Sequence, residues 1–369
     1  MNQGGADSAA PFLFYLSTDA KTVSSSPEAP DTAGPPMSPK SWRRILAPYT
    51  QPDRKRAAIQ LLTTALPLLA CAGIMLWGLA QGVWPLLVLA LPAAFFVVRS
   101  FMIQHDCGHG SFFRSTWTNN ALGSILGVLT LMPYGAWRRD HAVHHATSGN
   151  LARRGVGDVT TLTVAEYRAR SGFQRLPYRL YRHPAVLFGL GPAYVLLVRY
   201  RVPYARRLGD RGAWLSILGT NFSAAAAAAA LAIFVGPLEL LVGWGTVMLL
   251  ATAIGVWFFY VQHQFEDTYW RHAADWDFHA AAVEGSSFYD LPNLLHWLTA
   301  SIGFHHIHHL ASKIPNYRLR ACFKENPELR RAKRLTLWAS LKSVRLTLWD
   351  EERGKLVSFR EAARSARAG

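Results

Sequence analysis

The chain has 369 residues, half of them hydrophobic, and carries 39 Lys and Arg against 23 Asp and Glu, a formal net charge of +16. Its three cysteines form no CxxC pair, which argues against a disulfide framework and against a cysteine-based zinc site. The long apolar segments described below argue against a nucleic-acid-binding module, because such modules need no membrane spans. Attraction to anionic lipid explains the excess of basic over acidic residues, and we expect no nucleic-acid partner.

The N-terminal residues predict a leader without structure. They lack a basic n-region, and their only apolar run, residues 11–16, is too short for a signal peptide. Residues 17–40 are rich in Ser, Pro, Ala and Thr. We therefore expect a disordered leader over 1–40, one membrane domain over 41–355 and a tail over 356–369. The basic, aromatic stretch 41–56 is expected to lie along the membrane surface.

Four apolar runs predict membrane-spanning helices, each of which needs about 20 apolar residues. The second run ends at Val98, which is short, so its helix is expected to continue to Gln104 with Arg99 reaching back to the interface. Two shorter apolar stretches, 119–134 and 185–198, are expected to lie at the membrane interface rather than cross it. The predicted spans are 57–79, 83–104, 214–235 and 240–261.

The loops within each pair of spans, 80–82 and 236–239, contain no Lys or Arg. By the positive-inside rule these loops lie outside an inner (cytoplasmic) membrane, and both termini lie in the cytosol. The predicted fold is an all-α integral membrane protein in which two helical hairpins, with interfacial helices, support a cytosolic helical cap.

Eight histidines in three clusters are the strongest functional signal in the sequence. The spacings i, i+4 and i, i+3, i+4 place the members of each cluster on one helix face. Eight imidazoles exceed what one zinc ion can use, so they indicate two metal ions. No HExxH or ExxH motif is present, and a nitrogen-rich site with open positions is compatible with iron that activates oxygen. The clusters are His105 and His109; His141, His144 and His145; and His305, His308 and His309.

Carboxylates beside the clusters are candidates for contacts that fix the imidazole tautomers. They are Asp106, Asp140 and Asp158, for each of which a helix cap or a surface charge is the alternative.

Five segments resemble the membrane-bound acyl-lipid fatty acid desaturases of bacteria. The resemblance covers residues 50–355, and the five-residue first box and the third box beginning with His305 favour the acyl-lipid branch. No fused cytochrome b5 domain is visible. The segments are HDCGHGSFF, HHATSGN, FYVQHQFEDTYW, SSFYDLP and GFHHIHHLASKIPNYRL.

This resemblance implies two non-haem iron ions that use O2 and two electrons to introduce a cis double bond into a lipid acyl chain. The eight box histidines carry over as iron ligands. His263, in FYVQHQFEDTYW, is expected to be a ninth ligand, with Gln262 or Glu266 as alternatives. His306 and Glu266 are further candidates for contacts that support the ligands. A separate ferredoxin or cytochrome b5-like protein is expected to supply the electrons.

Several alternatives stay open at this stage. A di-iron hydroxylase or ketolase acting on an alkane, carotenoid or sphingolipid would use the same histidines, and a metal transporter is a more distant alternative. The aromatic residues 257–259 fit either a substrate tunnel or an interfacial belt. Arginines 138, 139, 153 and 154 could hold a headgroup or an acidic donor, or only attract the leaflet. Bond position, carrier form of the substrate and oligomeric state have no signal in the sequence.

Overall fold

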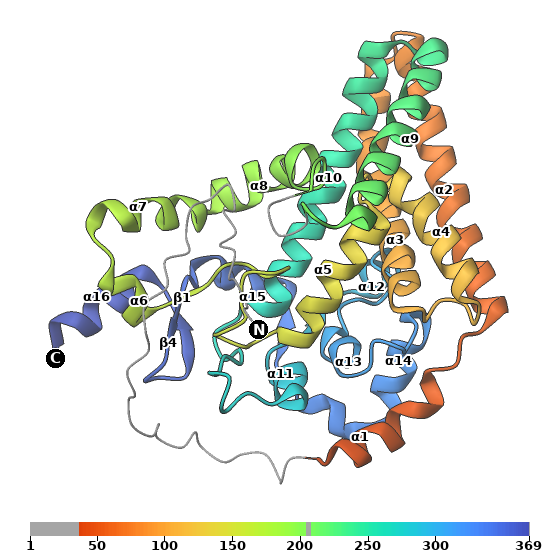
Figure 1. Cartoon of the computed structure of the whole chain (residues 1–369). Helices are drawn as coiled ribbons and strands as arrows, with labels where there is room; N and C mark the ends of the chain where they lie inside the picture. Colours follow the sequence, from red (N-terminus) through yellow and green to blue (C-terminus); the bar gives the residue numbers. More distant parts are fainter. Residues whose placement is uncertain (1–36, 204–207, 369) are drawn as a thin grey trace.

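The computed structural model describes residues 37–203 and 208–368, and helices dominate it. Four helices at one end of the molecule are long and apolar enough to cross a membrane, and they form two hairpins (Figure 1). The first hairpin joins α2 (Arg54–Ala80) to η2 (Trp84–Leu89) and α3 (Ala90–His109); the second joins α9 (Arg211–Val235) to α10 (Pro237–His263). The four predicted spans are confirmed. Two of these helices extend past the apolar run and end at a histidine.

The hairpin turns depend on glycine at positive φ. Gly82 (φ 77°) follows α2, and Gly236 (φ 91°) separates α9 from α10, where Pro237 then begins the next helix. Buried apolar residues join α2, α3 and α10 at their common interface, among them Met75, Ala93 and Val247. The outward faces instead expose large apolar side chains, the composition that lipid requires.

The shorter apolar stretches do not form spans. Helix α4 (Thr116–Leu129) packs against α3, and α5 (Tyr134–Thr147) follows it. Residues 185–199 form η3 (Ala185–Leu190), α8 (Gly191–Tyr194) and η4 (Val195–Arg199). Together with α7 (Gly172–Tyr181), they run across the axis of the hairpins rather than along it (Figure 1). This orientation is consistent with the expected interfacial position.

The remaining residues form a layer beneath the hairpins, built from short helices and five strands of two or three residues. β1 pairs parallel with β4 (Leu162 opposite Leu348), β4 pairs antiparallel with β5, and β2 pairs parallel with β3. The sequence did not predict these strands, because two or three residues are too few to show an alternation of apolar and polar side chains. The strands are β1 (Leu162–Thr163), β2 (Phe288–Asp290), β3 (Arg334–Thr336), β4 (Leu348–Asp350) and β5 (Lys355–Val357). The helices are α1 (Pro39–Leu46), η1 (Ala47–Tyr49), α6 (Val164–Ala169), α11 (Phe278–Glu284), α12 (Asn293–Leu298), α13 (His305–Leu310), α14 (Asn316–Glu325), η6 (Pro327–Arg331), α15 (Leu337–Ser340), η7 (Leu341–Arg345) and α16 (Phe359–Ala368).

The expectation that residues 41–56 lie along the membrane surface is wrong for helix α1. Helix α1 lies at the end of the molecule opposite the hairpins, where Trp42 and Leu46 are buried in one apolar cluster with Ile307. An amphipathic helix fits a protein core as well as a membrane surface, and here the core takes its apolar face. The predicted leader over 1–40 lies outside the described residues except at its end, where α1 begins at Pro39.

Arg99 does not reach back to an interface. It is buried between α2 and α12, where its guanidinium donates to Thr64 Oγ1 (3.0 Å) and to the Trp297 carbonyl. It also stacks over the Trp297 ring, with 4.4 Å between guanidinium carbon and ring centroid. These contacts replace the water that a charged group loses on burial.

Gly303 provides a test of how the third histidine cluster is held. A Cβ at this position would overlap the carbonyl oxygen of Tyr289 in β2 and lie 2.9 Å from His296 Cε1. We expect Gly303→Ala to lower the free energy of unfolding by about 1–3 kcal/mol, because the backbone must shift. Thermal unfolding in detergent measures this change. Gly73→Ala, where a Cβ meets no atom within 4 Å, is the matched control and should leave the midpoint unchanged or slightly raised. Equal midpoints for the two variants would contradict the close contact.

Candidate metal centre

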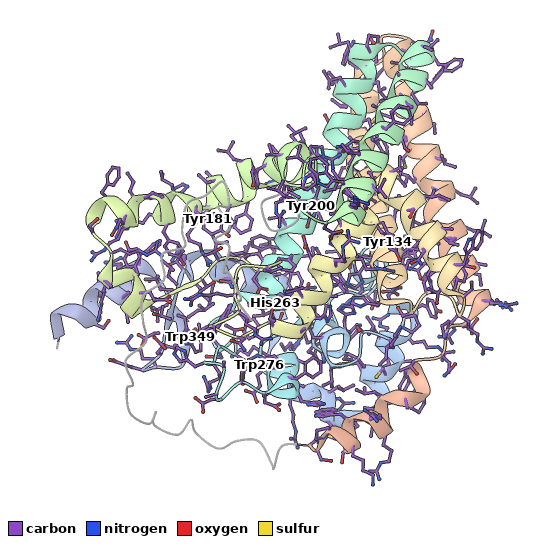
Figure 2. The ribbon with its side chains drawn as sticks, in the orientation of Figure 1. Tyr134, Tyr181, Tyr200, His263, Trp276 and Trp349 are labelled. Carbon is purple, nitrogen blue, oxygen red and sulfur yellow. The ribbon has the colours of Figure 1, made fainter. Side chains whose placement is uncertain are left out.

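Nine histidine side chains from four helices gather directly beneath the hairpins. Two come from the last two turns of α3, three from α5, one from the end of α10 and three from α13. Within each of two groups, one ligand nitrogen per residue lies within 4.8 Å of all the others. Figure 2 shows His263 at the lower end of α10, inside this layer. The first group is His105, His109, His141, His145 and His308; the second is His144, His263, His305 and His309.

The histidine-bearing helices approach closely because glycine stands where they meet. Gly108 is a residue of α3 that faces α5, and a Cβ at this position would be 3.0 Å from the Trp137 ring. Gly157 (φ 73°) passes over α5, where a Cβ would be 3.0 Å from His144 Cβ. The two groups are also adjacent, since the rings of His145 and His309 stack with centroids 4.2 Å apart. The arrangement is one site with two parts.

The imidazole nitrogens converge at the spacing of ligands around an ion. In the first group, the Nε2 atoms of His105 and His141 are 2.9 Å apart, and those of His145 and His308 are also 2.9 Å apart. In the second group, His305 Nε2 lies 3.0 Å from His263 Nε2. Two nitrogens at right angles, each about 2.1 Å from an ion, are about 3.0 Å apart. Each group therefore has the geometry of a metal site.

The opposite ring nitrogens are held by the protein. His144 Nδ1 donates to Asp158 Oδ1 (2.6 Å), and His263 Nδ1 donates to the Gly285 carbonyl (3.0 Å). His105 Nδ1 lies 3.3 Å from Asp106 Oδ1. These contacts fix the tautomer in which Nε2 is a free acceptor, the form that a metal ion requires.

The asparagine that follows the third cluster holds the carboxylate of Asp106 in turn. Asn316 donates its backbone and side-chain nitrogens to Asp106 Oδ2 at 2.7 and 2.8 Å. Among the described residues, the buried Nε2 atoms of His109 and His144 have no hydrogen-bond partner. Since a buried polar nitrogen without a partner is unfavourable, these atoms fit a bound metal ion.

Burial keeps five of the imidazoles neutral. It lowers the pKa of five cluster histidines well below the ordinary value, and the neighbouring histidines lower it further. A metal ion binds the neutral imidazole, so this environment favours metal over protons. The five are His141, His145, His305, His308 and His309.

Three other candidate residues point elsewhere. His306 packs its ring against Phe288 and Phe323, and burial lowers its pKa to about 3. Glu266 is exposed and pairs with Lys355 (2.8 Å). Asp140 pairs with Arg199 at 3.8 Å. The candidate carboxylates that lie against cluster rings in the described contacts are thus Asp106 and Asp158.

Aromatic rings cover the histidines on the side of the hairpins. Trp137 stacks on His141 with centroids 4.6 Å apart, and Phe259 lies 5.2 Å from His144 and 5.4 Å from His263. Trp257 donates its indole N–H to the Tyr289 hydroxyl (3.3 Å). Residues 257–259 are therefore partly buried against the protein.

Arg182 is an important residue that the sequence did not indicate. It is buried at the end of α7, where it donates to the Thr160 carbonyl (3.0 Å), to Gln264 Oε1 (2.9 Å) and to the Leu346 carbonyl (2.8 Å). Gln264 follows His263, and Thr160 is two residues from Asp158. Arg182 therefore joins the two segments that position the second group. One arginine among 39 basic residues has no pattern that would reveal it.

Comparison with known proteins identifies relatives along most of the chain. Residues 82–340, which include all nine histidines, match the family model described as fatty acid desaturase. The chain is 45% identical over 328 residues to a fatty acid desaturase of Bacillus subtilis, covering 87% of this chain and 91% of the relative. It is 31% identical over 237 residues to the sn-1 oleoyl-lipid 12-desaturase of Synechocystis sp. (62% and 65% covered). It is 30% identical over 238 residues to the sn-1 acyl-lipid omega-3 desaturase (ferredoxin) of the same organism (60% and 61%).

Asp158 gives a first test of the second group. Asp158→Asn removes the negative charge that holds His144, so the metal affinity of this group should fall by about 10- to 100-fold. Competition with a chelator, followed by metal analysis, measures the affinity. Glu266→Gln, an exposed carboxylate on a nearby segment, should keep the unaltered affinity. Equal affinities for both variants would contradict a role for Asp158.

Arg182→Met gives a second test. The change leaves the oxygens of Gln264, Thr160 and Leu346 without their buried donor, which frees the two segments beside the second group. We expect the metal content to fall from two ions per chain toward one, with the protein still folded. Arg179→Met, at an exposed position in the same helix, is the control. Loss of both ions, or of neither, would show that Arg182 does not act on one group.

Proposed function

The chain belongs to the fatty acid desaturase family, and we propose that it introduces a cis double bond into acyl chains of membrane lipids at a centre of two iron ions. One observation carries the proposal: two adjacent groups of five and four histidines lie where two membrane helices end. The relatives are named desaturases, some of them acyl-lipid enzymes, which favours desaturation over the hydroxylase, ketolase and transporter alternatives.

The nine histidines would hold the iron, five ligands for one ion and four for the other. Iron bound there would supply the oxidising power that removes two hydrogen atoms from neighbouring methylene groups. The reaction balances when one acyl –CH2–CH2– unit, O2, two electrons and two protons give –CH=CH– and two molecules of water.

The protein itself contributes orientation and the exclusion of water. Asp158, Asp106 and the Gly285 carbonyl fix the rings, so that the ligand set needs little rearrangement. Trp137 and Phe259 place apolar surface next to the histidines. An acyl chain that enters from the bilayer meets this surface, which would hold the reacting carbons close to the metals.

The substrate proposed is the acyl chain of a glycerolipid. Three of the nine histidines lie at the ends of α3 and α10, so an acyl chain already in the bilayer is the nearest apolar substrate. Two of the relatives named above carry acyl-lipid or oleoyl-lipid in their names. From the distribution of Lys and Arg, the proposed orientation places the histidine layer and both termini in the cytosol. A separate electron carrier, a ferredoxin or a cytochrome b5-like protein, would supply the electrons there.

A lipid analysis tests the function. Bacteria that express the chain should acquire a new unsaturated fatty acid, detected by gas chromatography and mass spectrometry, with the double bond located from the fragments. His308→Ala should abolish the product, because it removes a ligand from the first group. His183→Ala, an exposed histidine outside both groups, should leave the product unchanged. A hydroxylated or keto product would instead support the hydroxylase or ketolase alternative.

A further inference from the structure

A groove of about 400 Å³ opens at the end of the molecule farthest from the hairpins. Helix α1 forms one side, with Trp42, Arg43 and Leu46, and Leu310 and Ala311 at the end of α13 form part of the other. Figure 1 shows α1 beneath α13 and α14, and the hairpins extend from the opposite end. A lipid acyl chain that arrives through the bilayer would not reach this groove.

The groove is connected to the metal centre by a short path. Leu310 and Ala311 directly follow His308 and His309, which belong to the two different histidine groups. Trp42 packs in one buried cluster with Leu310 and Ile307, so no solvent layer separates the groove from α13. Electron transfer between proteins requires such a short, packed path from the surface to the acceptor.

The rim of the groove is basic. Lys40, Arg43 and Arg44 are exposed on α1, a helix without an acidic residue, and none of them forms an ion pair with another described residue. Lys313, two residues beyond Ala311, donates its ammonium to the His109 carbonyl (2.7 Å) and is not counted with this rim. Three exposed cations on the helix that forms one side of this groove make a surface that attracts an acidic partner.

We infer that this groove, with its basic rim, is the docking surface for a small acidic electron-carrier protein. Electron-transfer complexes are weak and small, below about 1,200 Å² of buried surface, and depend on complementary charge. The reduced carrier would bind, transfer one electron to the centre and leave oxidised, so that two carriers serve each double bond. This inference rests on the proposed function and adds the place at which the electrons enter.

Charge reversal tests the surface in the full-length, iron-loaded enzyme with lipid substrate. The probe is a reduced plant-type ferredoxin, and its oxidation is followed by absorbance at low and at high salt. For Arg43→Glu with Arg44→Glu, the KM for ferredoxin should rise by about tenfold at low salt, and the difference should shrink at high salt. Arg360→Glu with Arg364→Glu, two exposed arginines of α16, is the charge-matched control and should leave the KM nearly unchanged.

A second measurement removes the carrier from the reaction. The enzyme is reduced with dithionite without oxygen, freed of excess reductant and then exposed to O2 for one turnover. The groove variant should form as much double bond as the unaltered enzyme, because only docking is impaired. A ferredoxin KM that does not change, a similar rise in the control, or a loss of the single turnover would overturn the docking surface. Absence of a double bond from the unaltered enzyme would instead overturn the proposed function.

Discussion

The structure depends on keeping nine imidazoles together in a site with little water. For five of these rings, burial disfavours the charged form and the neighbouring rings disfavour it again, so their nitrogens are available to a metal ion and not to protons. Convergence of this kind is unfavourable without an ion, since several nitrogens face one another without a donor between them. The surrounding contacts therefore have one common effect, which is to prevent the rings from turning away.

Those contacts come from outside the histidine clusters. Asp158 and the Gly285 carbonyl hold two rings of the second group directly, and Arg182 holds the segments that carry them. Arg182 is buried without a carboxylate partner among the described contacts, and it is stabilised here by the carbonyl oxygens of Thr160 and Leu346 and by Gln264 Oε1. The second group, with four histidines, thus has a more extended support than the number of its histidines suggests.

The sequence predicted the parts of this protein that repeat a simple period. The four spans follow from runs of apolar residues, and the shared helix faces follow from spacings of three and four. The ends of α3 and α10 were harder, because both helices continue from apolar into polar sequence without a break. Arg182 and the Gly285 carbonyl had no pattern at all. The predicted position of α1 was wrong, because a helix such as PKSWRRIL has the same apolar face whether lipid or protein covers it.

Helices α3 and α10 run without interruption from the bilayer to His109 and His263. At 1.5 Å per residue, the 27 residues of α10 form a rod about 40 Å long. A tilt of about 3° at its outer end displaces the inner end by about 2 Å, and bilayers of different thickness impose tilts on such helices. A change in the tilt of α10 would therefore reach the histidine layer directly, because His263 is the last residue of the same rigid helix.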